Sequence, residues 1–256
     1  MPSATVDRHQ NNQIALLCTL HASSTSAKQK VTDLLSTGRE YYTTGKAQCT
    51  TWCYFTPSTR PKAPSQLISK DEKETVVAGF EIYSDKQALS TQQNEDWFKN
   101  FQKTVKEEKL FNERGEEQVV WYPTAGFVAR EDAAPPYGGI VMLAVFTCKE
   151  GKRDEVVKVV GSYTEFVREN EPGVLTYCTM VRPKAPNQIL LFERYQDSKA
   201  LGAHGTTKEF KAMFKGIAPH IEVKQTKLQQ FEEFDNAFVS NVIGGGRHEV
   251  AVAAKL

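Results

Sequence analysis

The chain has 256 residues, of which 40% are hydrophobic and 25% charged, and its formal net charge is +1. These values are typical of a soluble globular protein, and the balanced charge argues against a nucleic acid or an anionic membrane surface as partner. The apolar runs are too short to span a bilayer, and residues 1–12 lack the apolar segment of a secretion signal, so we expect no membrane insertion and an intracellular location.

Five cysteines, an odd number, predict free thiols in such a protein. Cys49 and Cys53 are four residues apart in a predicted strand, so their side chains project to one face. No histidine or second cysteine pair nearby completes a zinc site, and we therefore predict no metal centre. The cysteines are interpreted as small buried hydrophobic residues.

The first half of the chain alternates short apolar runs with helical patterns. Strands are expected at Ile14–His21, Ala47–Phe55, Thr75–Ser84 and Gln118–Val128. Helices are expected over residues 27–42 and from about Asp85 towards Leu110, the second with a break near Gln93–Asn94. A charged insertion, Ser69–Glu74, precedes the third strand.

The second half repeats this order more clearly. Strands are expected at Ile140–Thr147, Val174–Val181, Gln188–Tyr195 and Ile221–Phe231. A helix is predicted over Lys152–Asn170, because apolar residues recur there at helical spacing, and it stops at Glu171–Pro172–Gly173. A second helix runs from Asp197 or Ser198, either of which can cap it, to Gly216.

The two halves are copies of each other. RPKAP, one further residue and a glutamine occur at Arg60–Gln66 and again at Arg182–Gln188. When residues 78–101 are aligned with 190–213, eight of 24 positions are identical. These pairs are Phe80/Phe192, Glu81/Glu193, Tyr83/Tyr195, Asp85/Asp197, Ala88/Ala200, Leu89/Leu201, Phe98/Phe210 and Lys99/Lys211. A period above one hundred residues indicates a duplicated domain and not a solenoid.

Each copy has the order β-α-β-β-α-β, so the predicted fold class is α+β with two ferredoxin-like units in tandem. The strand Gln188–Tyr195 is apolar on both faces, which predicts that the two sheets pack face to face inside one chain. We divide the chain into a diverged domain at 12–130, a linker at 131–139, a second domain at 140–233 and a flexible tail at 234–256.

The second copy resembles the antibiotic biosynthesis monooxygenase (ABM) family. The similar segments are the Glu-Pro-Gly turn at Glu171–Gly173, the strand end Phe192–Tyr195, the helix segment Ala200–His204 and the helix end Phe210–Phe214. The first copy is a diverged partner, with Gln92 where the second has His204. The resemblance implies a dimeric α/β barrel, formed here as a pseudo-dimer within the chain.

The resemblance also implies an activity. Members of the family oxygenate phenolic polycyclic compounds such as anthrones with O2 and no cofactor, whereas others cleave haem, act on quinols or only bind small molecules. We therefore expect a cofactor-independent monooxygenase acting on a small phenolic, quinol-like, anthrone-like or oxylipin-like molecule. A non-catalytic, stress-response-like binding barrel and an isomerase or cyclase are the alternatives.

Cofactor-free oxygenation needs a base with a pKa near neutrality, and histidine suits this role. His204, at the family's histidine position, and Tyr195 are the candidate catalytic residues. The candidate substrate-binding residues are Tyr177, Phe192, Phe210, Phe214, Trp52, Tyr83 and Trp121. A histidine on a helix is, however, more often a surface or capping residue, and a strand tyrosine more often belongs to the core. Glu81 and Glu193 can be structural residues, paired with Arg60, Arg182 or Arg194.

The C-terminal tripeptide Ala254–Lys255–Leu256 resembles the SKL peroxisomal address. It follows a glycine run, Gly244–Gly246, that can present it to an import receptor. We therefore expect a peroxisomal location, with a cytoplasmic one as the alternative if the tail carries no address.

Overall fold

The structure is a computed structural model, and the residues it describes are 13–43, 49–130, 139–240 and 247–248. The strands are β1 Ile14–Ala22, β2 Cys49–Pro57, β3 Val76–Tyr83, β4 Phe111–Phe127, β5 Ile140–Thr147, β6 Val174–Val181, β7 Gln188–Tyr195, β8 Lys227–Ser240 and β9 Arg247–His248. The helices are α1 Thr25–Thr43, α2 Lys86–Gln92, α3 Asp96–Glu107, α4 Arg153–Asn170, α5 Ser198–His204 and α6 Lys208–Ile217.

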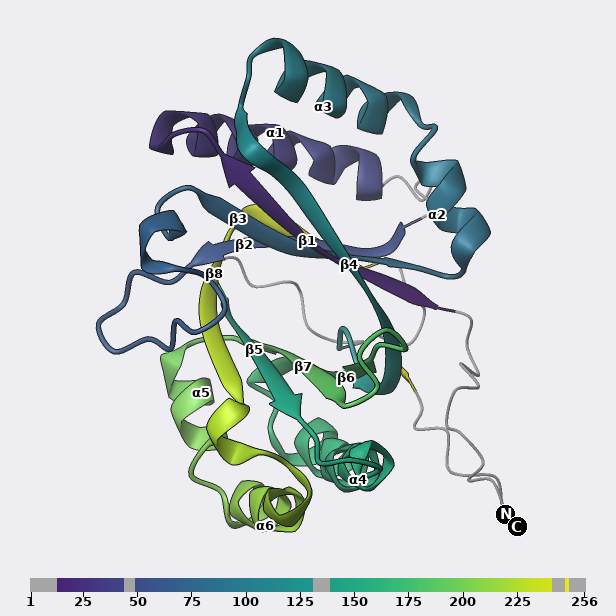
Figure 1. Ribbon diagram of the computed structural model, residues 1–256, viewed down its shortest axis with the longest axis vertical. Helices are drawn as coiled ribbons and strands as arrows, with labels where there is room; N and C mark the ends of the chain where they lie inside the picture. The colour runs from purple at the N-terminus through teal and green to yellow at the C-terminus, as the bar shows by residue number, and fades with distance from the viewer. Residues whose placement is uncertain (1–12, 44–48, 131–138, 241–246, 249–256) are drawn as a thin grey trace.

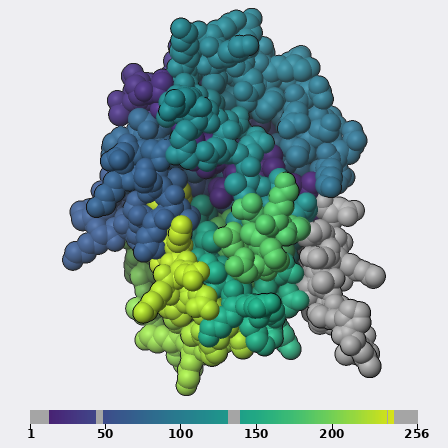
Figure 2. Space-filling view, viewed as in Figure 1, coloured from purple at the N-terminus to yellow at the C-terminus, as the bar shows by residue number. Residues whose placement is uncertain are grey.

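Eight strands form a closed antiparallel barrel. The first half contributes the sheet β4-β1-β3-β2 and the second half the sheet β6-β7-β5-β8, which is the strand order of two ferredoxin-like units. The sheets join at both edges, where β2 pairs with β8 and β4 pairs with β6. The predicted intrachain dimeric α/β barrel is thereby confirmed, and the space-filling view shows the two halves in close contact (Figure 2).

Alternation along the strands divides the core into three layers. One set of side chains points into the barrel, where the rings of Phe80 and Phe192, one from each half, lie 4.6 Å apart, with Phe55 and Phe231 beside them. The opposite set points outward and is covered by helices, α1 to α3 over the first sheet and α4 to α6 over the second (Figure 1). The double-sided burial expected for Gln188–Tyr195 follows from this arrangement.

β4 is longer than predicted, and β8 is displaced towards the C-terminus, because each of these strands pairs with strands of both sheets. Residues of β4 up to Trp121 pair with β1, whereas Tyr122–Phe127 pair with β6 of the other half. In the same way β8 pairs first with β5 and then with β2. The predicted final strand, Ile221–Phe231, was therefore wrong at both ends.

Gly126 allows β4 to approach β6 closely. Its φ is +109°, which side chains rarely adopt, and an added Cβ would lie 1.9 Å from the carbonyl oxygen of Tyr177. The β4–β6 register shifts just before Gly126, between Pro123 and Ala125. At Gly126 the backbone of the first half therefore lies directly against Tyr177 of the second half.

The helix after the third strand is broken in both copies. α2 and α5 are each seven residues long and are capped by Asp85 and Asp197, whose carboxylates accept the N–H groups of Ala88 and Ala200, at 2.8 Å in both cases. The break near Gln93–Asn94 was predicted, but the prediction of one continuous helix from Asp197 or Ser198 to Gly216 was wrong. The chain breaks after His204, and Thr207 caps a new helix, α6, by accepting the N–H of Phe210.

Other sequence expectations have mixed outcomes. All five cysteines are free and buried, as predicted. The linker residues 131–138 and the tripeptide Ala254–Lys255–Leu256 lie outside the described residues, so the peroxisomal address stays a prediction. None of the helices in the described segments combines the length and the apolar character needed to cross a membrane.

We predict that Phe192→Ala lowers the free energy of unfolding by about 3–5 kcal/mol, because it opens a cavity in the barrel interior where both halves meet. Phe214→Ala is the matched control, since Phe214 is 37% exposed on α6 and its loss should change stability by less than about 0.5 kcal/mol. Urea unfolding of both variants measures the difference, and equal stabilities would contradict the assigned core.

Candidate functional site

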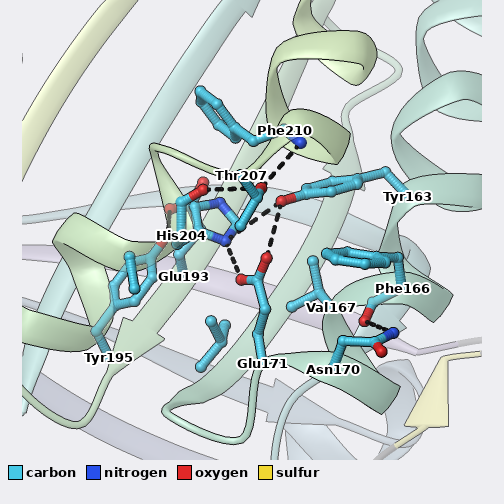
Figure 3. A network of polar contacts seen from close by, with 12 residues as sticks. Tyr163, Phe166, Val167, Asn170, Glu171, Glu193, Tyr195, His204, Thr207 and Phe210 are labelled. Atoms are coloured by element: carbon cyan, nitrogen blue, oxygen red, sulfur yellow. Dashed lines mark hydrogen bonds and ion pairs between the residues drawn. The ribbon is translucent and has the colours of Figure 1, made fainter.

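The candidate site lies between the second sheet and helices α4 to α6, and not inside the barrel. His204, the last residue of α5, is only 3% exposed. Tyr177 on β6 and Tyr195 on β7 face it from the sheet, and Phe210 faces it from α6. The break between α5 and α6 turns the chain so that His204 points inward (Figure 3).

A carboxylate holds one side of the imidazole. Nδ1 of His204 is paired with Oε2 of Glu171, a residue of the turn that ends α4. The hydroxyl of Tyr163, on α4, donates to Oε1 of the same carboxylate at 3.3 Å and lies 3.5 Å from Nδ1 (Figure 3). Because the carboxylate accepts the Nδ1 proton, Nε2 is left with the lone pair of the neutral ring.

Aromatic rings surround the imidazole on its other sides. The ring centroids of Tyr163, Tyr177, Tyr195 and Phe210 lie 5.8, 5.5, 5.4 and 5.1 Å from that of His204. These rings shield His204 from bulk water and give its surroundings a low effective dielectric constant.

Nε2 of His204 and the hydroxyl of Tyr177 are both buried without a hydrogen-bond partner. Buried polar groups are nearly always paired, and leaving one unpaired costs about 1–3 kcal/mol. Two such atoms on neighbouring rings mark a place where a polar group of a ligand can bind.

Glu193 adds a buried carboxyl to the site. The hydroxyl of Tyr195 donates to Oε2 of Glu193, and burial raises the pKa of Glu193 even though this hydrogen bond and the nearby His204 act to lower it. Burial also raises the pKa of the Tyr177 and Tyr195 hydroxyls well above their ordinary value. Both phenols therefore stay protonated at neutral pH, and Tyr177 can donate a hydrogen bond to a ligand.

Residues 139–216 match the sequence model of the family described as antibiotic biosynthesis monooxygenase. This segment contains every side chain of the candidate site. We call this matching segment the ABM domain. The resemblance seen in the sequence of the second copy is thereby confirmed.

Solved structures match the chain over both halves. A candidate monooxygenase from Lactobacillus acidophilus superimposes with a TM-score of 0.73 over 90% of this chain and 97% of its own, at 11% identity. One from Fusobacterium nucleatum gives 0.70 over 93% and 97%, at 16% identity. An anthrone oxidase-like protein gives 0.53 over 97% and 98%, at 12% identity. At these identities the likeness concerns the fold, and no curated protein sequence matches the chain significantly.

The structure brings four of the predicted site residues together in the ABM domain, namely His204, Tyr195, Tyr177 and Phe210. It separates the others from them. Phe192 points into the barrel, on the opposite face of β7 from Tyr195, because neighbouring strand residues alternate. Phe214 lies on the exposed face of α6.

The three remaining predicted residues belong to the first half. Trp121 faces the barrel interior, with the guanidinium of Arg182 5.7 Å from its ring. Trp52 and Tyr83 lie in the outer layer of the first half, at the places of Tyr177 and Tyr195 in the ABM domain. The strand registers establish this correspondence, since Trp52 is opposite Glu81 and Tyr177 is opposite Glu193.

The first half lacks the arrangement around His204. Gln92 ends α2 where His204 ends α5. Glu81 accepts hydrogen bonds from Tyr54 at 2.8 Å and Tyr83 at 2.6 Å, and burial raises its pKa. The indole of Trp52 stacks on Tyr42 at 4.7 Å in an aromatic cluster.

The expected pairing of Glu81 and Glu193 with arginines was wrong, because these carboxyls face the helices and accept from tyrosines. Arg194 instead points into the barrel, where it pairs with Glu233, and Arg60 pairs with Glu232 at 2.9 Å. A single-residue alternation along β7 separates Glu193 from Arg194.

Sequence reasoning missed Glu171, Tyr163 and Glu193 as parts of the site. Glu171 was interpreted as a helix stop and Tyr163 as part of an apolar stripe, and both descriptions hold locally. The signal for Glu171 was its place in the Glu-Pro-Gly segment, which the family pattern contains. Among the residues described, no group of three or more His, Cys, Asp or Glu side chains could hold a metal ion.

The raised pKa of Glu193 predicts a pH dependence of stability. A carboxyl with a higher pKa in the folded state binds more protons when folded, so its contribution to the free energy of unfolding falls as pH rises from about 4.3, the ordinary value, through the raised one. Glu193→Gln removes this term, and its stability should fall less than that of the wild type across this interval. Urea midpoints from pH 4 to 8 measure this change in stability with pH, with Glu165→Gln on the exposed side of α4 as control. Identical slopes for wild type and Glu193→Gln would contradict the assignment.

Proposed function

We propose that this protein is a cofactor-independent monooxygenase that uses O2 to oxygenate a small phenolic molecule of the quinol or anthrone type. The chief support is the buried His204, whose Nδ1 is held by Glu171 and whose Nε2 is unpaired among aromatic rings. The ABM match and the likeness of the fold to an anthrone oxidase-like protein agree with this activity.

His204 acts as the general base in this proposal. Nε2 takes a proton from the phenol or from the activated carbon of the substrate, and the imidazolium so formed is stabilised by the Glu171 carboxylate. Tyr177, whose ring centroid lies 5.5 Å from that of His204, donates from its hydroxyl to the substrate oxygen on which negative charge develops.

The substrate anion then reacts with O2. It transfers one electron to O2, and combination of the two radicals forms a carbon–oxygen bond and a peroxide anion. The imidazolium returns its proton to this peroxide, and loss of the second proton from the same carbon breaks the O–O bond. One CH2 group and one O2 thus become one C=O group and one H2O, and O2 accepts all four electrons that the carbon loses.

The surroundings of His204 suit this chemistry. The four aromatic rings can lie against a flat aromatic substrate, and the low exposure of His204 keeps water away from the anion. Burial raises the pKa of Glu193 and so favours its neutral form, which opposes formation of the anion less than a carboxylate would. We therefore propose an electron-rich aromatic substrate, because such a ring can itself reduce O2.

We expect His204→Ala to lower O2 consumption with anthrones or quinols by about 10²–10⁴-fold, the usual contribution of a general base. His220→Ala is the matched control, because His220 belongs to the same half but lies in the 3-10 helix Ala218–His220, away from Glu171. An oxygen electrode with product analysis measures both variants.

The same experiment separates the alternatives. O2 uptake that is unchanged in His204→Ala removes the base from its role. Substrate rearrangement without O2 uptake favours an isomerase or cyclase, and tight binding without turnover favours a non-catalytic binding barrel.

Tyr177→Phe should lower kcat/KM by about 10–100-fold, because a hydrogen bond to a charged oxygen contributes about 1.5–3 kcal/mol. Tyr54→Phe removes a hydroxyl from the equivalent layer of the first half and leaves Tyr83 paired with Glu81, so its turnover should match that of the wild type. Steady-state O2 consumption compares the two variants. An equal loss in both would assign the effect to packing.

A further inference from the structure

Arg130 follows β4 of the first half, yet its guanidinium reaches into the second half. Nε donates to the carbonyl oxygen of Val174 at 2.6 Å and Nη1 to that of Arg168 at 2.8 Å. Nη2 donates to the carbonyls of Val167 at 3.1 Å and Glu171 at 2.8 Å. One side chain therefore binds four carbonyls around the end of α4.

Val167 and Arg168 lie in the last turn of α4, whose carbonyls a helix end leaves short of partners, whereas Glu171 and Val174 follow the helix. α4 ends at Asn170, and the next residues, Glu171 to Gly173, turn the chain into β6. The planar guanidinium carries five N–H donors in a fixed geometry, so it can bind several carbonyls at once. It also lies 5.0 Å from the ring centroid of Phe127, which fixes it against β4.

The turn that Arg130 holds carries Glu171, whose carboxylate binds Nδ1 of His204. The backbone of Glu171 is fixed by its own N–H on Val167, by the N–H of Val174 and by Arg130. A displacement of this backbone would move the carboxylate away from the imidazole. We propose that Arg130 is a positioning residue through which the first half of the chain orients the His204–Glu171 pair of the second half.

This inference rests on the proposed function, in which His204 is the base, and it gives the diverged half a role in the reaction. An ABM site formed from the second half alone lacks the four hydrogen bonds of Arg130. Phe127 makes the same connection through packing, since it pairs with Tyr177 on β6 and is buried in the outer core of the second half.

The test compares Arg130→Ala, Arg130→Lys and Glu171→Gln in the full-length chain. Arg130→Ala should lower kcat about 10–100-fold with a smaller change in KM, because misplacing a catalytic group by about 1 Å can cost 10²-fold. Its pH profile should shift in the same direction as that of Glu171→Gln. Arg130→Lys, which keeps the charge but cannot bind four carbonyls, should be intermediate.

Arg168→Ala is the matched control. Arg168 lies 5.5 Å from the same Phe127 ring and donates to the carbonyl of Gly126 at 3.4 Å, but its side chain does not bind the Glu171 turn. This variant should keep kcat within about twofold of the wild type. Nitrogen NMR of the His204 ring provides a second readout that needs no turnover, because its tautomer depends on the Glu171 contact.

The outcomes distinguish this inference from the proposed function. If the wild type oxygenates no phenol but the His204 ring signals of Arg130→Lys change as in Glu171→Gln, the positioning role stands and the function fails. If folded Arg130→Lys and Arg130→Ala keep the wild-type kcat, pH profile and ring signals, the inference is overturned. If Arg130→Ala does not fold, the ring signals of Arg130→Lys decide.

Discussion

Closure of the barrel by the β4–β6 and β2–β8 pairs is the constraint on which the rest of the structure depends. A four-stranded sheet with helices on one face leaves its other face apolar and both edges unpaired. Here each sheet covers the face of the other and completes its edges, so that Phe80 and Phe192 meet in a common interior. Apolar burial and backbone hydrogen bonding are therefore satisfied by the same event.

The long strands also mix the cores of the two halves. The end of β4 places Phe127 in the outer layer of the second half, and the end of β8 places Val239 in that of the first. Neither layer is made from one copy alone. Because the duplication joins both partners in one chain, each copy always packs against the same partner. The copies can therefore diverge while each still contributes a strand end to the outer layer of the other.

Divergence has changed the polar groups of the two layers differently. Both copies keep a buried glutamate, but Glu81 accepts from two tyrosines, whereas the carboxyl of Glu193 accepts from one. Where the first half has Trp52 and Gln92, the second has Tyr177 and His204, and Nδ1 of His204 is held by Glu171. An imidazole can take up a proton near neutral pH, whereas the amide of Gln92 cannot. This difference is the physical reason for proposing the chemistry in the second half.

The sequence by itself determined the duplication, the ferredoxin-like order of each copy and the bounds of β5, β6 and β7, and it placed His204, Tyr177, Tyr195 and Phe210 within a larger set of candidate site residues. These follow from periodicity, capping residues and a family pattern, all of which are local in the chain. Only the tertiary structure decided which face of β7 belongs to the site, that Glu171 holds His204, that β4 and β8 extend into the other half, and that Arg130 crosses between them. These features depend on contacts between residues far apart in sequence. The local pattern of a strand shows neither which of its faces meets the site nor which distant strand it pairs with.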